Sequence, residues 1–159
     1  HDCVVPLMSK DNIDVITTGG KLDRVSHSYC GISALSLMKR FSIDKAFFSC
    51  NGLDLERGAS EVAEIHAEFK ENSLSICREK ILLCDSSKFG VQSLRFFCDI
   101  NSIDTVITDS IKFSRLCLQK RSEFSIYFNL QEREENTLAL QNILRANRFY
   151  RILRQSAQK

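Results

Sequence analysis

Residues 80–90, KILLCDSSKFG, are the stretch of sequence that decides the fold. The apolar run at 81–84 has the length of a strand buried in a parallel sheet, and a polar cluster follows where that strand would end. In open α/β sheets, ligands bind beyond the carboxyl ends of the strands. An acid, two hydroxyls and an amine there suit a polyol or phosphate, so Asp85, Ser87 and Lys88 are candidate binding residues. An ordinary polar turn is the alternative, because these residue types are common in loops.

Elements on either side of this stretch alternate between strand and helix patterns. Strands are predicted near residues 13, 43, 80, 103 and 124, and helices near residues 31, 61 and 112. Ser60 is the expected N-cap of the second helix, whose acids Glu61, Glu64, Glu68 and Glu71 are expected to form a solvated face. Because parallel neighbours need a crossover connection, this order predicts an α/β fold with a mainly parallel sheet flanked by helices.

Glycines follow the ends of two of the other predicted strands. Residues 13–17 alternate apolar and polar side chains and lead into Gly19 and Gly20, which permit positive φ and a close approach of a ligand to the backbone. Residues 43–49 lead into Asn51 and Gly52, a strong turn signal at a strand's carboxyl end. Both pairs are candidate binding positions, and a plain turn is the alternative at each.

Four blocks of sequence resemble, in order, the C-terminal effector-sensing domain of DeoR-family bacterial transcriptional repressors. They are IDVITTGGKL at 13–22, IDKAFFSCNGLDLERG at 43–58, DSSKFG at 85–90 and SIDTVITDS at 102–110. The resemblance implies a ribose-5-phosphate isomerase-like, CoA-transferase-like version of the α/β fold. It also implies a truncated sensing domain at 1–130. Residues 131–159 lie beyond the resemblance, and because they contain neither proline nor glycine we expect a helical extension there.

The same resemblance implies a phosphorylated sugar as the effector. It assigns Asn51 and Gly52 to the effector crevice, adds Lys45 as a weaker candidate, and retains Glu64 from a Thr-Thr and Asn-Glu pattern. Glu61 stands where that pattern carries a hydroxyl, and an acid beside a phosphate would repel the ligand. Because the first residue is His1, we expect a fragment that lacks both the winged helix-turn-helix and a phosphate-holding loop. DNA binding is therefore expected only through that absent domain.

Composition narrows the remaining functions. The chain has 159 residues, of which 43% are hydrophobic and 26% charged, and no apolar run long enough to cross a bilayer, so we expect a cytoplasmic protein that binds no membrane. Its seven cysteines form no C-x-x-C pair, several lie in apolar runs, and the three histidines make no ligand set. We therefore expect small reduced core cysteines, and neither a metal nor a cofactor.

The C-terminal tail leaves two readings open. Arginines recur every third residue from Arg145 to Arg154 in a segment that also carries a partial apolar stripe. A basic stripe can bind nucleic acid, but packing against another subunit fits the apolar half better, so a homo-oligomer is expected.

An enzyme of the same fold is the main functional alternative. Phosphosugar isomerases resemble this chain in a D-x-S-K segment, so Lys88 alone does not separate an isomerase or deaminase from a sensor. Isomerisation needs a positioned carboxylate, and where those enzymes carry an acid-rich D-G-A-D-E block this chain reads C-N-G-L-D. We expect a sensor without enzymatic activity.

Overall fold

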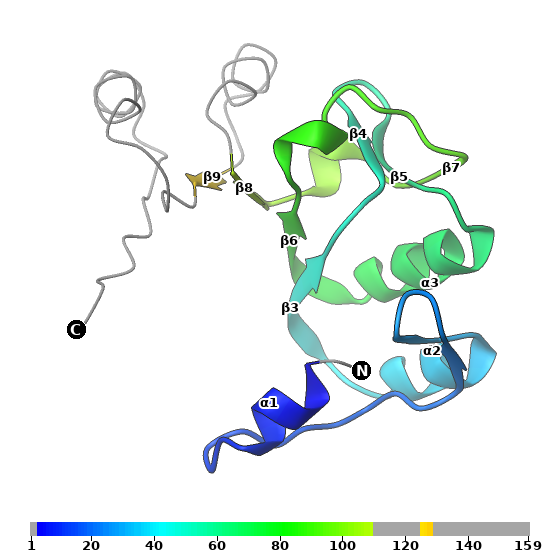
Figure 1. Ribbon diagram of the computed structural model, residues 1–159, viewed down its shortest axis with the longest axis vertical. Helices are drawn as coiled ribbons and strands as arrows, with labels where there is room; N and C mark the ends of the chain where they lie inside the picture. The colour runs from blue at the N-terminus through cyan, green and yellow to red at the C-terminus, as the bar shows by residue number, and fades with distance from the viewer. Residues whose placement is uncertain (1–2, 110–124, 129–159) are drawn as a thin grey trace.

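The computed structural model describes residues 3–109 and 125–128, and its elements are drawn in Figure 1. The helices are α1 (Val4–Met8), α2 (Ile32–Met38) and α3 (Glu64–Leu74), with short 3-10 turns η1 (Ser86–Lys88) and η2 (Ile100–Ser102). The strands are β1 (Lys21–Asp23), β2 (Ser28–Cys30), β3 (Ile43–Phe48), β4 (Gly52–Asp54), β5 (Gly58–Glu61), β6 (Cys77–Leu83), β7 (Arg95–Cys98), β8 (Thr105–Thr108) and β9 (Ser125–Phe128).

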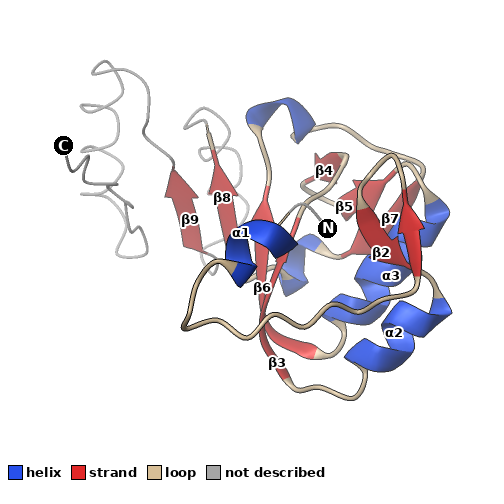
Figure 2. Ribbon diagram, turned by 60° about the horizontal axis from the view of Figure 1, so that its bottom comes forward, coloured by secondary structure: helices blue, strands red, loops and turns tan. Residues whose placement is uncertain are grey.

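A parallel sheet of order β3-β6-β8-β9 forms the centre of the fold. All three of its pairings are parallel, and Figure 2 shows the four strands side by side. The strands predicted near 43, 80, 103 and 124 are confirmed, and so is the α/β class. Leu82 on β6 and Val106 on β8 are almost fully buried, which explains why these strands read as continuous apolar runs. The likeness to ribose-5-phosphate isomerase stays a prediction.

A second sheet, antiparallel and of order β4-β5-β7, packs beside the first. It corrects the prediction that Ser60 caps a helix, because residues 58–61 are strand β5 and α3 begins at Glu64 after Ala63. Ser60 is buried, and its hydroxyl donates to the Gly52 carbonyl at 3.1 Å. Pairing with strands on both sides therefore outweighs the local capping signal.

One prediction for the N-terminal segment is wrong and one is confirmed. Residues 13–17 form no strand, and Ile16 stays 66% exposed, because no sheet face covers these alternating side chains. An antiparallel hairpin of β1 and β2 follows instead, with Lys21 opposite Cys30. The helix predicted near residue 31 is confirmed, since α2 begins at Ile32 after β2 takes up Tyr29.

The core lies between the two sheets and α3. It includes Phe48, Leu53, Ala67, Leu82 and Phe97, with the Phe48 and Phe97 rings packed edge to face at 6.1 Å. The cysteines at 30, 50, 77, 84 and 98 are buried free thiols, as predicted, whereas Cys3 is exposed. None of the helices in the described part is long and apolar enough to cross a membrane. The predicted helix near 112 and the extension 131–159 with its arginines lie outside the described residues.

Candidate functional site

The segments that follow β3 and β6 meet at one edge of the parallel sheet. The Cys50 and Cys84 sulfurs lie 3.7 Å apart, directly after the two strands. Further along, Leu53 pairs with Phe89, and the Gly90 amide donates to the Leu53 carbonyl at 2.8 Å. The turn that starts at Asn51 therefore runs beside the DSSKFG segment, as a crevice at the carboxyl ends of the strands requires.

The segment after β6 is held by hydrogen bonds within itself and to the residue that follows β8. The Asp85 carboxylate accepts from the Ser87 backbone at 2.9 Å and from the Ser87 hydroxyl, and these bonds hold the pKa of Asp85 below its usual range. The Ser86 amide donates to the Asp109 carboxylate at 2.7 Å. Lys88 is half-buried, and its ammonium lies within ion-pair distance of no carboxylate among the described residues. Lys88 is therefore the cation of this segment that can meet an anion.

Asn51 and Gly52 differ in what they can offer a ligand. Asn51 is exposed. Its backbone N–H donates to the Ser60 carbonyl at 3.0 Å, and its side-chain oxygen accepts from the Val62 backbone N–H at 3.3 Å. Gly52 is buried, and a Cβ there would lie 2.4 Å from the Val91 carbonyl oxygen. Gly52 thus permits the two segments to pack closely, whereas Asn51 presents a polar side chain.

A polar cleft of about 260 Å³ opens beside Asn51. Its walls come from the β1–β2 hairpin, the end of β3, strand β5 and helix α3, and its lining residues are Ser26, Ser28, Ser49, Cys50, Asn51, Glu61, His66 and Lys70. Asn51 is the one predicted site residue in this lining. Lys70 and His66 were not predicted, because they come from a helix whose packing the sequence does not show, whereas Glu61 was expected beside the ligand only as a repelling acid.

Glu61 and Lys70 form an ion pair in the wall of this cleft. Their carboxylate and ammonium are in direct contact, and Lys70 also donates to the Ser49 carbonyl at 2.8 Å. The prediction that Glu61 is solvated is wrong, since the residue is 7% exposed and strand β5 turns it inward. Its charge is neutralised by Lys70, so the expected repulsion of an anionic ligand loses its basis. Glu64, Glu68 and Glu71 are exposed, as predicted.

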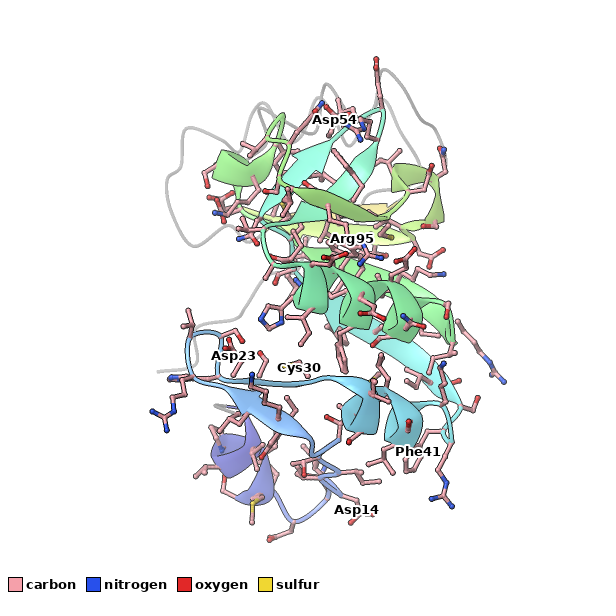
Figure 3. All side chains as sticks on the ribbon, turned by 90° about the vertical axis from the view of Figure 1, so that its right-hand side faces the viewer. Asp14, Asp23, Cys30, Phe41, Asp54 and Arg95 are labelled. Carbon is pink, nitrogen blue, oxygen red and sulfur yellow. The ribbon has the colours of Figure 1, made fainter. Side chains whose placement is uncertain are left out.

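His66 links the hairpin to α3 across the cleft. Its Nε2 lies 3.5 Å from the Asp23 carboxylate and 3.5 Å from the Ser26 hydroxyl. Hydrogen bonds from the Ser26 side chain and backbone lower the pKa of Asp23, which keeps an anion facing this histidine. Figure 3 shows Asp23 on the hairpin, below the layer that contains Arg95.

The other four predicted residues are not among those that line this cleft. Glu64 is exposed and pairs with Arg95 at 3.5 Å, and Lys45 forms an exposed pair with Glu79 at 3.3 Å. Gly19 and Gly20 both have positive φ, as expected for the turn. A Cβ on Gly20 would lie 3.0 Å from the Cys30 carbonyl oxygen, so this glycine allows close packing of the hairpin.

Comparisons with known proteins find one family and several regulators. The family model described as "DeoR C terminal sensor domain" matches residues 2–110. The HTH-type transcriptional regulator YulB of Bacillus subtilis, described as uncharacterized, is 34% identical over 106 residues, covering 67% of this chain and 41% of that protein. The putative aga operon transcriptional repressor of Escherichia coli O157:H7 is 32% identical over 103 residues, covering 65% and 38%. The HTH-type transcriptional regulator GlpR of Haloferax volcanii is 35% identical over 105 residues, covering 66% and 41%. The chain therefore matches less than half the length of each of these relatives.

Proposed function

The chain belongs to the family of DeoR C-terminal sensor domains, and from this premise we propose that it senses a phosphorylated sugar on behalf of a transcriptional regulator. Relatives named for the aga operon and the L-fucose operon support a carbohydrate effector. A helix-turn-helix part of the whole regulator would contact DNA, as the HTH-type names of other relatives suggest.

The observation that carries this proposal is the Lys88 ammonium, which pairs with no carboxylate of the described residues and belongs to the segment that runs beside the Asn51 turn. The hydrogen bond from Cys84 lowers the pKa of Cys50, and the charges of Lys70 and Lys88 act in the same direction. The Lys88 charge therefore reaches a residue that lines the cleft. An ammonium binds phosphate as a point charge, while the Asn51 amide and nearby hydroxyls suit the hydroxyl groups of a sugar.

Regulation requires only that the effector bind two arrangements of the regulator with different affinity. We propose that the sensor assembles as a homo-oligomer, and that the bound sugar phosphate changes how its subunits are arranged. The change then alters the affinity of the helix-turn-helix part for DNA.

A sugar-phosphate isomerase or deaminase is the alternative, and the carboxylates at this sheet edge argue against it. A catalytic base must reach the substrate with a free carboxylate. Asp85 accepts two hydrogen bonds from Ser87, and Glu61 is bound to Lys70. We therefore propose a binding function without turnover, which conversion of ribose 5-phosphate by the purified chain would contradict.

The test is a thermal-shift screen of the purified chain against a panel of phosphorylated sugars. At least one sugar phosphate should raise the midpoint of wild-type unfolding, and Lys88→Ala should abolish that rise. Arg78→Ala is the matched control, because Arg78 lies on β6, the strand that leads to the Lys88 segment, is exposed and pairs with Asp44. An equal rise in the Lys88→Ala and wild-type proteins would reject the role of Lys88, and no rise with any sugar phosphate would reject the effector class.

A further inference from the structure

Two buried thiols face each other at the carboxyl edge of the parallel sheet. Cys50 follows β3 and is 7% exposed, whereas Cys84 follows β6 and is 5% exposed. Their sulfur atoms lie 3.7 Å apart, which is hydrogen-bonding distance for two thiols. Neither thiol has a place in the proposed binding of a sugar phosphate.

The backbone holds this pair in register on both sides. Phe48 pairs with Leu82 two residues before the cysteines, and Leu53 pairs with Phe89 after them. Neighbouring strands lie about 4.8 Å apart, and the Cα atoms of disulfide-bonded cysteines are about 4.4–6.8 Å apart. A bond between Cys50 and Cys84 therefore needs rotation of the two side chains and little movement of the backbone.

The surroundings give the two thiols different chemical roles. The hydrogen bond from Cys84 lowers the pKa of Cys50, burial opposes this, and the Lys70 charge supports it. The same hydrogen bond, together with burial, raises the pKa of Cys84. Cys50 also lines the polar cleft, which gives a small oxidant a route to it. Because Cys50 lines the cleft and Cys84 is not among its lining residues, Cys50 is the attacking residue and Cys84 the resolving one.

We propose that Cys50 and Cys84 are a redox modification site at which a peroxide forms an intramolecular disulfide. The Cys50 thiolate attacks one peroxide oxygen, the O–O bond breaks, and the released hydroxide takes up a proton to become water. This leaves a sulfenic acid on Cys50. The Cys84 sulfur then attacks the Cys50 sulfur, the S–O bond breaks, and hydroxide leaves as water with the Cys84 proton. Two thiols and one peroxide thus give one disulfide and two waters.

The bond would tie together the two segments that contain Asn51 and Lys88. If those segments bind the effector as proposed above, oxidation would change its affinity, and that consequence rests on the proposed function. Formation of the disulfide does not, so the chemistry is tested without any sugar present.

The experiment treats the reduced, unaltered 159-residue chain with hydrogen peroxide, alkylates the remaining thiols under denaturing conditions and maps the peptides by mass. The expected result is a chain lighter by two hydrogens, with one crosslinked peptide pair that joins Cys50 to Cys84 and is separated again by dithiothreitol. Full alkylation of both cysteines after treatment, or crosslinks to other cysteines in preference to this pair, would overturn the proposal.

Single substitutions then separate the two roles. In Cys84→Ser, the Cys50 sulfenic acid has no resolving partner, so a dimedone adduct should accumulate on Cys50 and none should form in Cys50→Ser. Cys98→Ser is the matched control, because Cys98 is also buried but its sulfur lies 3.3 Å from the Ser102 hydroxyl. That variant should form the Cys50–Cys84 crosslink to the wild-type extent, and loss of the crosslink there would also count against the assignment.

Discussion

Two polar groups lie at the same edge of the parallel sheet, and they are held in opposite ways. The η1 group, Asp85 to Lys88, is largely exposed, and the bonds of Asp85 reach only to Ser87. The α3 group joins Glu61 of β5, Lys70 of α3 and the Ser49 carbonyl after β3, and both charged side chains are mostly buried. The first group depends mainly on its own residues, with one further bond from Ser86 to Asp109 after β8, whereas the second exists only when three separate elements are packed together.

This difference predicts different energetic consequences. In an exposed turn, water can replace each hydrogen bond that is lost. Removal of such a bond therefore lowers the free energy of unfolding only slightly. Removal of one partner from a buried ion pair leaves the other charge uncompensated away from water, which costs much more.

Lys70→Met should have the largest effect of the substitutions compared here. It leaves the Glu61 carboxylate buried without its partner, so the free energy of unfolding should fall by about 3 kcal/mol. Urea denaturation at neutral pH measures this change.

Lys45→Met is the matched control, because Lys45 pairs with Glu79 in an exposed position. Its cost should stay below about 1 kcal/mol. Addition of Glu61→Gln to Lys70→Met should restore part of the lost stability, since the uncompensated charge is then gone. Equal costs for the Lys70 and Lys45 variants would show that the α3 group is no more buried in solution than a surface pair.

Gly52→Ala tests the contact that brings the two groups together. The new Cβ would lie 2.4 Å from the Val91 carbonyl oxygen, so the segments after β3 and β6 must separate. We expect a loss of about 1–3 kcal/mol, as for other overpacked sites, measured by the same denaturation.

Gly19→Ala separates steric clash from backbone strain. Gly19 has positive φ, but a Cβ there meets no atom within 4 Å. Its substitution should therefore lower the free energy of unfolding by about 1 kcal/mol or less.

A Gly52→Ala protein as stable as the wild type would mean that the two segments pack less tightly than described.

Asp85→Asn should have the smallest effect, and one that depends on pH. Hydrogen bonds from the Ser87 side chain and backbone lower the folded-state pKa of Asp85 from its ordinary 3.8, so the ionised carboxylate stabilises the fold above that pH. The contribution disappears as the pH falls from 3.8 through the lower folded-state pKa.

Thermal unfolding of the wild type and the Asp85→Asn variant as a function of pH checks this expectation. The small advantage of the wild type at neutral pH should vanish in acid. An advantage that persists well below the folded-state pKa would assign the stabilisation to something other than the ionised carboxylate.

The parallel sheet was predictable because its central strands carry buried apolar residues, although Phe47 on β3 and Leu83 on β6 stay exposed. Residues 81–84 and 103–108 appear as short apolar runs whatever surrounds them, and β6 and β8 lie there. The alternating pattern at 13–17 was too short to predict a strand correctly. In the described residues no neighbouring strand pairs with this segment, so it has no partner that would hold it in a sheet. Ser60 shows a related limit, because a serine before a helical pattern is a good N-cap unless β pairing claims its backbone.

The α/β class, the order of the parallel strands along the chain and the polar turn at Asp85 to Lys88 could be inferred from the residues alone, because they follow mainly from burial of whole segments or from hydrogen bonds between near neighbours. The contacts of Glu61 with Lys70, of His66 with Asp23 and of Cys50 with Cys84 became visible only in the folded chain. Each of these contacts joins side chains from different elements. No local spacing specifies such a contact, because it arises from the way the hairpin, the two sheets and α3 bury their apolar faces against one another.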